Sequence, residues 1–324
     1  MQYKRQDGMR RTAIVKDQQV HLLDSDKSIY QLAKLALTKG GTLLEEINGL
    51  KTINSTYVSD FLKLNHEIMT PISIEDTPWI VMSGTGLTHI NSALMRDNMM
   101  DSTGKLSDAQ KIYHSGLENG KPSNKDIGAM PEWFFKGFGN ALKPSYTDLS
   151  IPAYALGGGE EAELAVMYII DDHGNPCRLG FCLGNEFSDH LLEQQNHYYL
   201  AQSKLRQCSI GSELYIGPPP EEVTGEIKIV RAGEIIWQKA FHTGFKNMTH
   251  SLQNIEQQIL KYDIFRQPGA VHVFFLGADQ TSFADKIVLQ DGDTVSIKVD
   301  LFDISLVNNI IEEAQTQNIQ VKYL

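Results

Sequence analysis

The sequence has few cysteines and lacks any long apolar run. Three cysteines, Cys177, Cys182 and Cys208, occur in 324 residues, and no two of them have C-x-x-C spacing. A sparse, odd count is typical of a reducing compartment and argues against a disulfide-stapled secreted domain. No stretch approaches the run of about 20 apolar residues that a membrane span needs. The charged residues 1–5 are not followed by the apolar segment of a signal peptide. We therefore expect a cytoplasmic protein that does not enter the membrane.

A basic surface is also missing from this chain. It has 29 Lys and Arg residues against 40 Asp and Glu residues, which gives a formal net charge of -11. This balance argues against a nucleic-acid partner, which would require a basic stripe or patch. It does not exclude a small anionic substrate, because only the local field of a cleft acts on such a ligand. Apolar residues make up 41% of the chain, as is usual for a folded protein with a large core.

The pattern of apolar residues predicts an α+β fold that is mainly β and has two parts. Residues 1–75 form a small mixed module with two short strands and helices over 29–39 and 43–50, the first of which ends at Gly40-Gly41. Residues 76–324 are dominated by short strands, including 162–170, 179–183 and 214–217, with a helix over 252–262. A strand over 79–82 is expected to run into a glycine-rich turn at 83–86.

The most informative residues are two glutamates at the start of a strand. Glu161 and Glu163 precede the apolar residues 164–170. Because residues i and i+2 of a strand point to the same face, the two carboxylates would lie side by side at the edge of a core. Such carboxylates repel each other and raise each other's pKa unless a cation lies between them. A divalent ion with oxygen ligands would remove that conflict.

A third acid, Glu186, ends the next apolar strand. A hairpin through residues 171–175 would bring it close to the other two. Three carboxylates without His or Cys favour magnesium, manganese or calcium over zinc. An E-x-E pair is also common on solvated strand faces, so the spacing alone leaves both interpretations open. The glycine run 157–159 lacks the context of a nucleotide-binding loop and is interpreted as a turn.

Several motifs, in order and at matching spacing over about residues 78–310, resemble the fumarylacetoacetate hydrolase superfamily. They are PEWFFK at 131–136, EAELAV at 161–166, NEFSD at 185–189, AQSK at 201–204 and LQDGDTV at 289–295. The resemblance implies a compact β-roll of mixed sheets, usually a homodimer, with Mg²⁺ or Mn²⁺ held by three acids. By position these are Glu161, Glu163 and Glu186. The third departs from the usual Asp, and the family's "SARD" tail is broken at Ser188-Asp189-His190, so no role of its arginine is transferred.

Two segments resemble the branch that dehydrates 2-keto-3-deoxy sugar acids: TSFAD at 281–285 and SGTGLTH at 83–89. The resemblance implies a lyase that converts a 2-keto-3-deoxypentonate to 2-oxoglutarate semialdehyde through a metal-stabilised enolate. Lys204 is the first candidate for proton transfer, with a pKa lowered by its surroundings, and His89 is a second. The candidates for substrate binding are Arg96, Lys136, Thr281 and Ser282.

Two other kinds of function remain possible from the sequence. The first is a related enzyme with the same metal: a hydrolase that cleaves a C–C bond of a 2,4-diketo acid, or a hydratase or decarboxylase. Such a hydrolase commonly uses a Glu–His pair, and no glutamate partner of His89 can be identified from the sequence. The second is a non-catalytic ligand-binding protein on the same fold. The joint presence of the three acids and Lys204 favours an enzyme.

Overall fold

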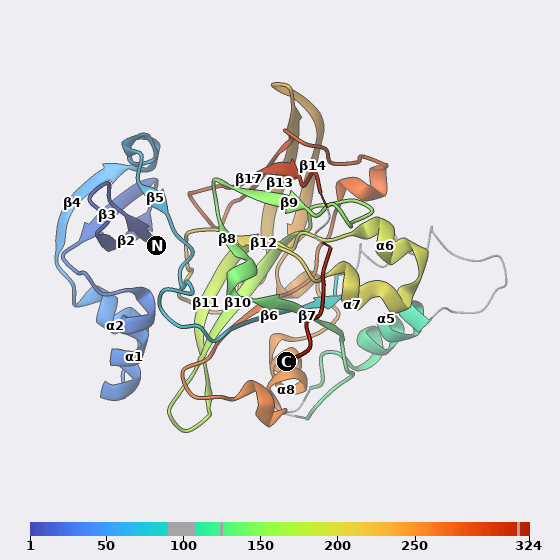
Figure 1. Ribbon diagram of the computed structural model, residues 1–324. Coiled ribbons are helices and arrows are strands. Elements are labelled where there is room, and N and C mark those ends of the chain that lie inside the picture. The colour runs from blue at the N-terminus through green and yellow to red at the C-terminus, as the bar shows by residue number, and fades with distance from the viewer. Residues whose placement is uncertain (90–107, 124–125, 316–317) are drawn as a thin grey trace.

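Three β-sheets form the framework of the structure, a computed structural model that describes residues 1–89, 108–123, 126–315 and 318–324 (Figure 1). Sheet-forming residues prevail, so the expected α+β, mainly β class is confirmed. None of the helices in these ranges is long and apolar enough to cross a membrane.

The first sheet belongs to the N-terminal module and has the strand order β4-β3-β2-β1-β5. Its strands are β1 (Gln2–Lys4), β2 (Arg10–Lys16), β3 (Gln19–Leu23), β4 (Thr52–Tyr57) and β5 (Glu67–Ile68). Three helices accompany it: α1 (Ile29–Lys39), α2 (Leu43–Asn48) and α3 (Val58–Phe61). Helix α1 begins with a capping box between Ser28 and Gln31 and ends at Gly40, whose φ of 68° lies in the left-handed region that favours glycine.

The second sheet has seven described strands and carries the candidate site. Its order is β7 (Glu132–Phe138), β6 (Ile80–Gly86), β15 (Val271–Phe275), β10 (Ala162–Ile170), β11 (Pro176–Asn185), β12 (Cys208–Ile210) and β8 (Leu142–Pro144). Strands β10 and β11 pair antiparallel, as the predicted hairpin requires. Every residue of β10 is buried, which is expected for a strand covered on both faces of its sheet.

The third sheet packs against the second. Its strands are β14 (Glu234–Thr243), β13 (Val223–Arg231), β16 (Thr294–Val299), β17 (Leu306–Glu312) and β9 (Thr147–Ile151). The other helices among the described residues are α5 (Asp108–Asn119), α6 (His190–Gln195), α7 (Leu200–Ser203) and α8 (Leu252–Leu260). Short 3-10 turns occur at Leu62–Leu64, Gly139–Ala141, His197–Tyr199, Phe245–Asn247, Asp263–Phe265 and Ser282–Asp285.

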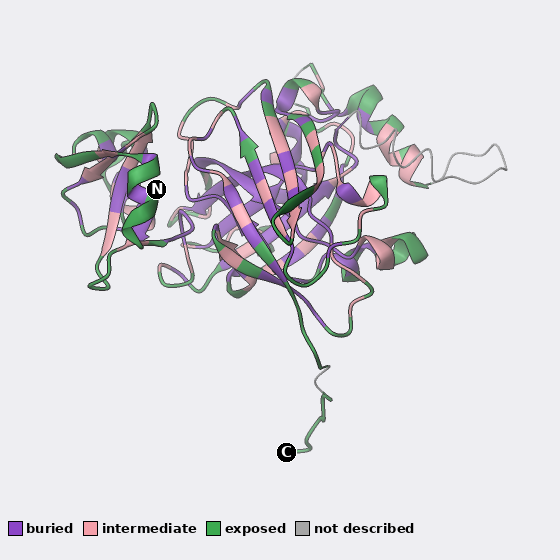
Figure 2. Ribbon diagram, turned by 90° about the horizontal axis from the view of Figure 1, so that it is seen from above, coloured by how far each residue is buried: buried purple, intermediate pink, exposed green. Residues whose placement is uncertain are grey.

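Alternate residues of β10 enter two different cores. Leu164 and Val166 pack with α8 and with strands of the third sheet. Ala165 and Met167 point the other way, into a core that also contains Leu32 of α1 and residues of α2. The period of two residues along a strand produces this division. As a result the buried strands in the middle of the molecule are enclosed on both sides (Figure 2).

Two expectations about local structure are wrong. Residues 83–86 do not form a turn: they continue β6, because Ser83 pairs with Phe135 of β7 on one side and with Phe274 of β15 on the other. Residues 214–217 form no strand, and only an isolated bridge joins Tyr215 to Phe181. The division into domains at residues 1–75 and 76–324 falls between β5 and β6 and stays a proposal.

Candidate metal centre

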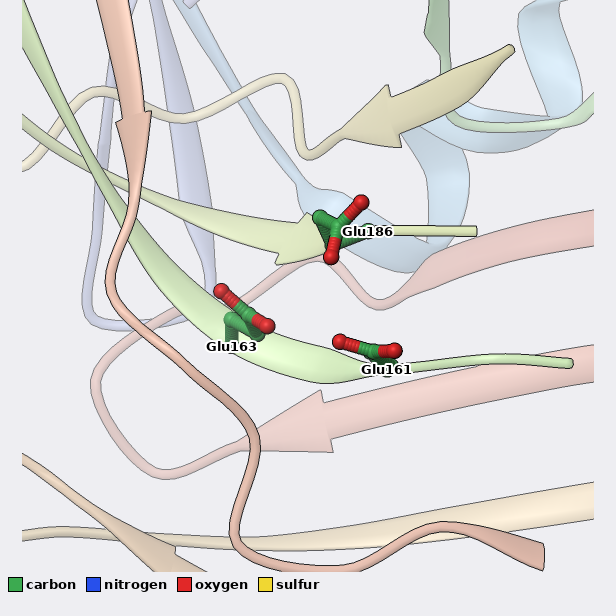
Figure 3. A group of neighbouring side chains, drawn as sticks. All are labelled: Glu161, Glu163 and Glu186. Carbon is green, nitrogen blue, oxygen red and sulfur yellow. The ribbon is translucent and has the colours of Figure 1, made fainter. Parts of the chain in front are cut away.

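The β10–β11 hairpin brings the three predicted glutamates together. In its register Ala162 lies opposite Asn185, and just beyond this pair the backbone N–H of Glu186 donates to the carbonyl oxygen of Glu161 at 2.9 Å. One carboxylate oxygen from each of Glu161, Glu163 and Glu186 lies within 4.8 Å of the others, and all three residues are buried. Figure 3 shows the three carboxylates facing one another from the two adjacent strands.

A β-bulge determines which face of the hairpin Glu186 occupies. Met167 pairs with Gly180, whereas Tyr168 pairs with Arg178, so Leu179 is an extra residue in β11. One extra residue inverts the alternation of side chains along the rest of the strand. The bulge therefore fixes the face on which Glu186 meets Glu161, which precedes β10, and Glu163, the second residue of β10.

Two buried lysines contact the glutamates directly. The Nζ of Lys136 lies 2.6 Å from Oε1 of Glu186. The Nζ of Lys204 donates to Oε1 of Glu161 at 2.6 Å, to Oε2 of Glu186 at 2.9 Å and to the hydroxyl of Ser188 at 3.0 Å. Three carboxylates and two ammonium groups leave a formal charge of -1 (-3 + 2). The lysines thus neutralise only part of the cluster.

The three carboxyls have different electrostatic surroundings. Burial and the repulsion of Glu186 and Glu161 raise the pKa of Glu163 well above its usual range. Burial likewise raises the pKa of Glu186, although Lys136 and Lys204 oppose the shift. Burial acts on Glu161 in the same direction, but the Lys204 ammonium and a hydrogen bond from His190 outweigh it and hold its pKa well below the usual range.

The arrangement fits a hard divalent cation. Hydrogen-bond donors occupy Oε1 of Glu161 and both carboxylate oxygens of Glu186, and the Gly277 N–H donates to Oε2 of Glu163 at 2.7 Å. Within the described ranges no group donates to Oε2 of Glu161 or to Oε1 of Glu163. An all-oxygen, buried set with net negative charge suits Mg²⁺ or Mn²⁺ and not zinc.

The electrostatics of Lys204 differ from the expectation. A lowered pKa is predicted from the sequence, and burial does act in that direction. Attraction to Glu161 and Glu186 outweighs burial, however, and raises the pKa of Lys204 above its ordinary value. The Nζ also lies 4.9 Å from the centre of the Phe134 ring, a cation–π contact that further favours the charged form. In this environment Lys204 is a cation that donates hydrogen bonds.

His89 is buried and engaged with threonines. Its Nε2 lies 3.1 Å from the hydroxyl of Thr243, and its Nδ1 lies 3.5 Å from that of Thr88. Burial lowers the pKa of His89 to about 4. The imidazole is therefore neutral at neutral pH, and it would act as a hydrogen-bonding group and not as a cationic acid.

The predicted substrate-binding residues have varied surroundings. Lys136 is completely buried and its Nζ contacts Oε1 of Glu186. Ser282 donates its N–H to one oxygen of Glu160 at 2.6 Å and its hydroxyl to the other at 2.7 Å, so this hydroxyl is already committed. Thr281 is partly buried at the start of the Ser282–Asp285 turn. Arg96 lies outside the described residues.

Three site residues were missed by the sequence analysis. Glu132 lies on the same buried face of β7 as Phe134 and Lys136, a pattern that the alternation in residues 132–136 could have indicated. Its carboxylate lies 3.8 Å from the Nε2 of His197. Glu160 is fully buried against Ser282, and burial raises its pKa. The third residue is His190, whose Nε2 lies 2.7 Å from Oε1 of Glu161. No local pattern could have indicated these last contacts, because they join residues from distant parts of the chain.

Comparison with solved structures gives the fold of the whole chain. 2-Keto-3-deoxy-D-arabinonate dehydratase in its apo form matches with a TM-score of 0.69 and 19% identity, over 97% of this chain and 99% of that one. A structure of this dehydratase complexed with magnesium and 2,5-dioxopentanoate matches equally well, at 20% identity over 97% of this chain and 99% of that one. The chain has the dehydratase's fold.

A 2-hydroxyhepta-2,4-diene-1,7-dioate isomerase from Mycobacterium marinum shares the fold less closely, with a TM-score of 0.56 and 14% identity over 97% of this chain and 98% of that one. The resemblance predicted from the sequence is thus confirmed at the level of the fold. No family model matches the sequence, and no curated protein matches it either.

Proposed function

We propose that this protein is a metal-dependent lyase that dehydrates a 2-keto-3-deoxy sugar acid, such as a 2-keto-3-deoxypentonate, to 2-oxoglutarate semialdehyde. The observation that carries the proposal is the convergence of Glu161, Glu163 and Glu186 within 4.8 Å, with Lys204 bonded to two of them. The fold shared with the arabinonate dehydratase supports it. One structure of that protein contains magnesium and 2,5-dioxopentanoate, which is 2-oxoglutarate semialdehyde.

The residues of the candidate site have separate roles in metal binding and proton transfer. Glu161, Glu163 and Glu186 would hold Mg²⁺ or Mn²⁺, and the bound ion would supply Lewis acidity toward the 2-keto group, which acidifies the C3 protons. Lys204, as a cation, can hold the substrate carboxylate or donate a proton to the C4 hydroxyl as it leaves as water. A buried carboxylate is suited to accept the C3 proton. After water has left, the same group can return this proton to C3 while the neutral Lys204 amine takes one from C5, which converts the 3,4-enone to the aldehyde by way of its enol and restores both residues. We propose Glu132 as this carboxylate, because it shares a face of β7 with Phe134, which contacts Lys204.

A second candidate function is hydrolysis of a C–C bond in a 2,4-diketo acid. Glu132 and the Nε2 of His197 lie 3.8 Å apart, and a carboxylate–imidazole pair of this kind can activate a water molecule. His197 is partly exposed, at 43% of its side chain, which weakens the case for a shielded base. Dehydration therefore remains the first proposal.

Turnover of purified protein tests the proposal directly. We expect Mg²⁺-dependent release of an aldehyde from a 2-keto-3-deoxypentonate and little cleavage of 2,4-diketo acids. Glu163→Gln should lower kcat by about 100-fold or more, because it removes one charged ligand. Glu222→Gln is the matched control, since Glu222 is exposed and its ion pair in the described part of the chain is with the surface residue Lys246. A wild-type protein without affinity for Mg²⁺ or Mn²⁺ would instead support the non-catalytic alternative.

The resemblance noted in the sequence also leads us to propose a homodimer, and the sparse cysteines lead us to propose a cytoplasmic location. Neither proposal depends on whether the enzyme dehydrates or hydrolyses its substrate.

A further inference from the structure

Among the described residues, the side chain of His190 makes one polar contact, with a glutamate of the candidate metal centre. Its Nε2 lies 2.7 Å from Oε1 of Glu161. Its Nδ1 is buried and has no hydrogen-bond partner among the described residues. Oε1 of Glu161 already accepts from the Lys204 ammonium at 2.6 Å, so the contact with His190 is assigned to a hydrogen on Nε2 that donates to the same carboxylate oxygen. The polar capacity of this imidazole is therefore directed entirely at Glu161.

The surroundings of His190 fix the ring in place. His190 is the first residue of α6, and Asp189 caps this helix by accepting from the N–H of Leu192 at 3.1 Å. Arg206 holds the same Asp189 side chain through a buried ion pair at 3.1 Å. The ring packs on Phe283, with 5.0 Å between the ring centres. Backbone, cap and aromatic contact together leave the imidazole little freedom to turn away from Glu161.

Gly159 provides the space that the ring occupies. A Cβ at this position would lie 2.2 Å from Nδ1 of His190, a distance that is sterically impossible. Gly159 is not among the residues with positive φ, so its backbone does not require glycine. Two backbone hydrogen bonds, at 2.9 and 3.0 Å, tie Gly159 to Ser188 and keep the two segments close. The lack of a side chain at Gly159 is therefore explained by the position of His190.

We propose that His190 is a positioning residue that orients Glu161 for metal binding. His190 and Lys204 both bond to Oε1 of Glu161, which would leave Oε2 available to a cation. This inference rests on the proposed metal centre but adds a determinant of its affinity. A hydrogen bond that orients a ligating carboxylate typically changes metal affinity by about 10–100-fold when it is removed.

The test is a titration of the full-length protein with Mn²⁺, followed by electron paramagnetic resonance or calorimetry without substrate. We expect His190→Leu, which keeps bulk but removes the donor, to weaken Mn²⁺ binding by about 10–100-fold. His190→Gln should restore most of the affinity, because its amide nitrogen stands the same number of bonds from Cα as Nε2 does. His173→Leu, in the exposed hairpin turn, should leave the affinity unchanged.

Gly159→Ala gives a second, independent test through a double-mutant cycle. Alanine should push the imidazole away and weaken Mn²⁺ binding in the wild-type background. In a His190→Ala background the same change should add no further loss, since no ring remains to be displaced. Thermal unfolding in the presence of a chelator identifies any general loss of stability, which the positioning role does not predict.

The outcomes separate this inference from the proposed function. If the wild-type protein binds no Mn²⁺, the metal centre itself is refuted, and the role of His190 with it. If the wild type binds and His190→Leu binds equally well, only the positioning role is refuted. Equal weakening in His190→Leu and His190→Gln would also overturn the proposal, because the hydrogen bond would then not be the operative feature.

Discussion

Lys204 takes its properties from its neighbours and not from its residue type. The same lysine in an apolar pocket would lose its charge, because burial disfavours an ammonium ion. Here Glu161 and Glu186 lie at hydrogen-bonding distance, so the ammonium form is retained and its pKa is raised. This makes Lys204 a donor toward a substrate anion and also a partial counter-ion for the cluster.

These two roles predict opposite effects of a neutral replacement at Lys204. We expect Lys204→Met to lower kcat by about 100-fold or more, the usual contribution of a positioned proton donor. The loss of one positive charge should favour Mg²⁺ binding and offset the loss of the Lys204 donor to Glu161, so the affinity should not fall as it does in His190→Leu. Steady-state kinetics and calorimetry measure the two effects separately. Unchanged turnover in this variant would remove Lys204 from the mechanism.

Some residues of the candidate site could be predicted from the sequence, and others could not. Glu161 and Glu163 follow from alternation along one strand, and Glu186 follows once a hairpin is assumed. The contacts of Glu160 with Ser282 and of His190 with Glu161 could not be predicted, because they depend on where a distant turn and a short helix pack. Ser282 was predicted to bind substrate, but its hydroxyl donates to Glu160, and this contact could not be predicted either.

At the level of secondary structure, the pairing of β6 with β7 determines the surroundings of Glu132. Gly86 lies opposite Glu132 in this register, and a Cβ on Gly86 would lie 1.9 Å from a carboxylate oxygen of Glu132. The φ of Gly86 is not positive, so the requirement for glycine comes from space alone. The segment that the sequence suggested to be a turn is thus a strand whose glycine admits a buried acid.

Gly86→Ala should therefore displace the Glu132 carboxylate while the strand keeps its backbone. We expect kcat to fall on the order of 100-fold, because a misplaced proton acceptor loses most of its effect. The melting temperature should change little, since the clash is with the flexible end of a side chain. Gly211→Ala, whose Cβ would meet Leu183 at an ordinary 3.4 Å, is the control. Normal turnover of Gly86→Ala would argue against Glu132 as the proton acceptor.

At the scale of the whole molecule, Glu213 links the segment after β12 to the turn before β17. Its Oε1 accepts from the backbone N–H groups of Asp303 and Ile304 at 3.0 and 2.9 Å. Ile304 packs in the core of the N-terminal module beside Tyr3. Burial raises the pKa of Glu213 to about 7 from an ordinary value of 4.5. This carboxyl therefore couples protonation to the contact between the two parts of the chain.

The raised pKa of Glu213 predicts how stability depends on pH. Between pH 4.5 and 7 the folded state keeps a proton that the unfolded state has lost. The free energy of unfolding should therefore fall as pH rises through this window, by up to about 3 kcal/mol from this group. Glu213→Gln should flatten this dependence in urea unfolding at pH 5 and pH 8. An equally steep dependence in the variant would show that other groups cause it.

The sequence by itself determined the class of fold, the hairpin and the three carboxylates, because these depend on periodicity and on neighbours along the chain. The bounds of α1 could likewise be predicted, since a capping box and a left-handed glycine are local signals. The tertiary structure alone decided the charge state of Lys204, the continuation of β6 through residues 83–86 and the contact of His190 with Glu161. Each of these depends on packing between segments far apart in the chain, where distance and burial set the energies.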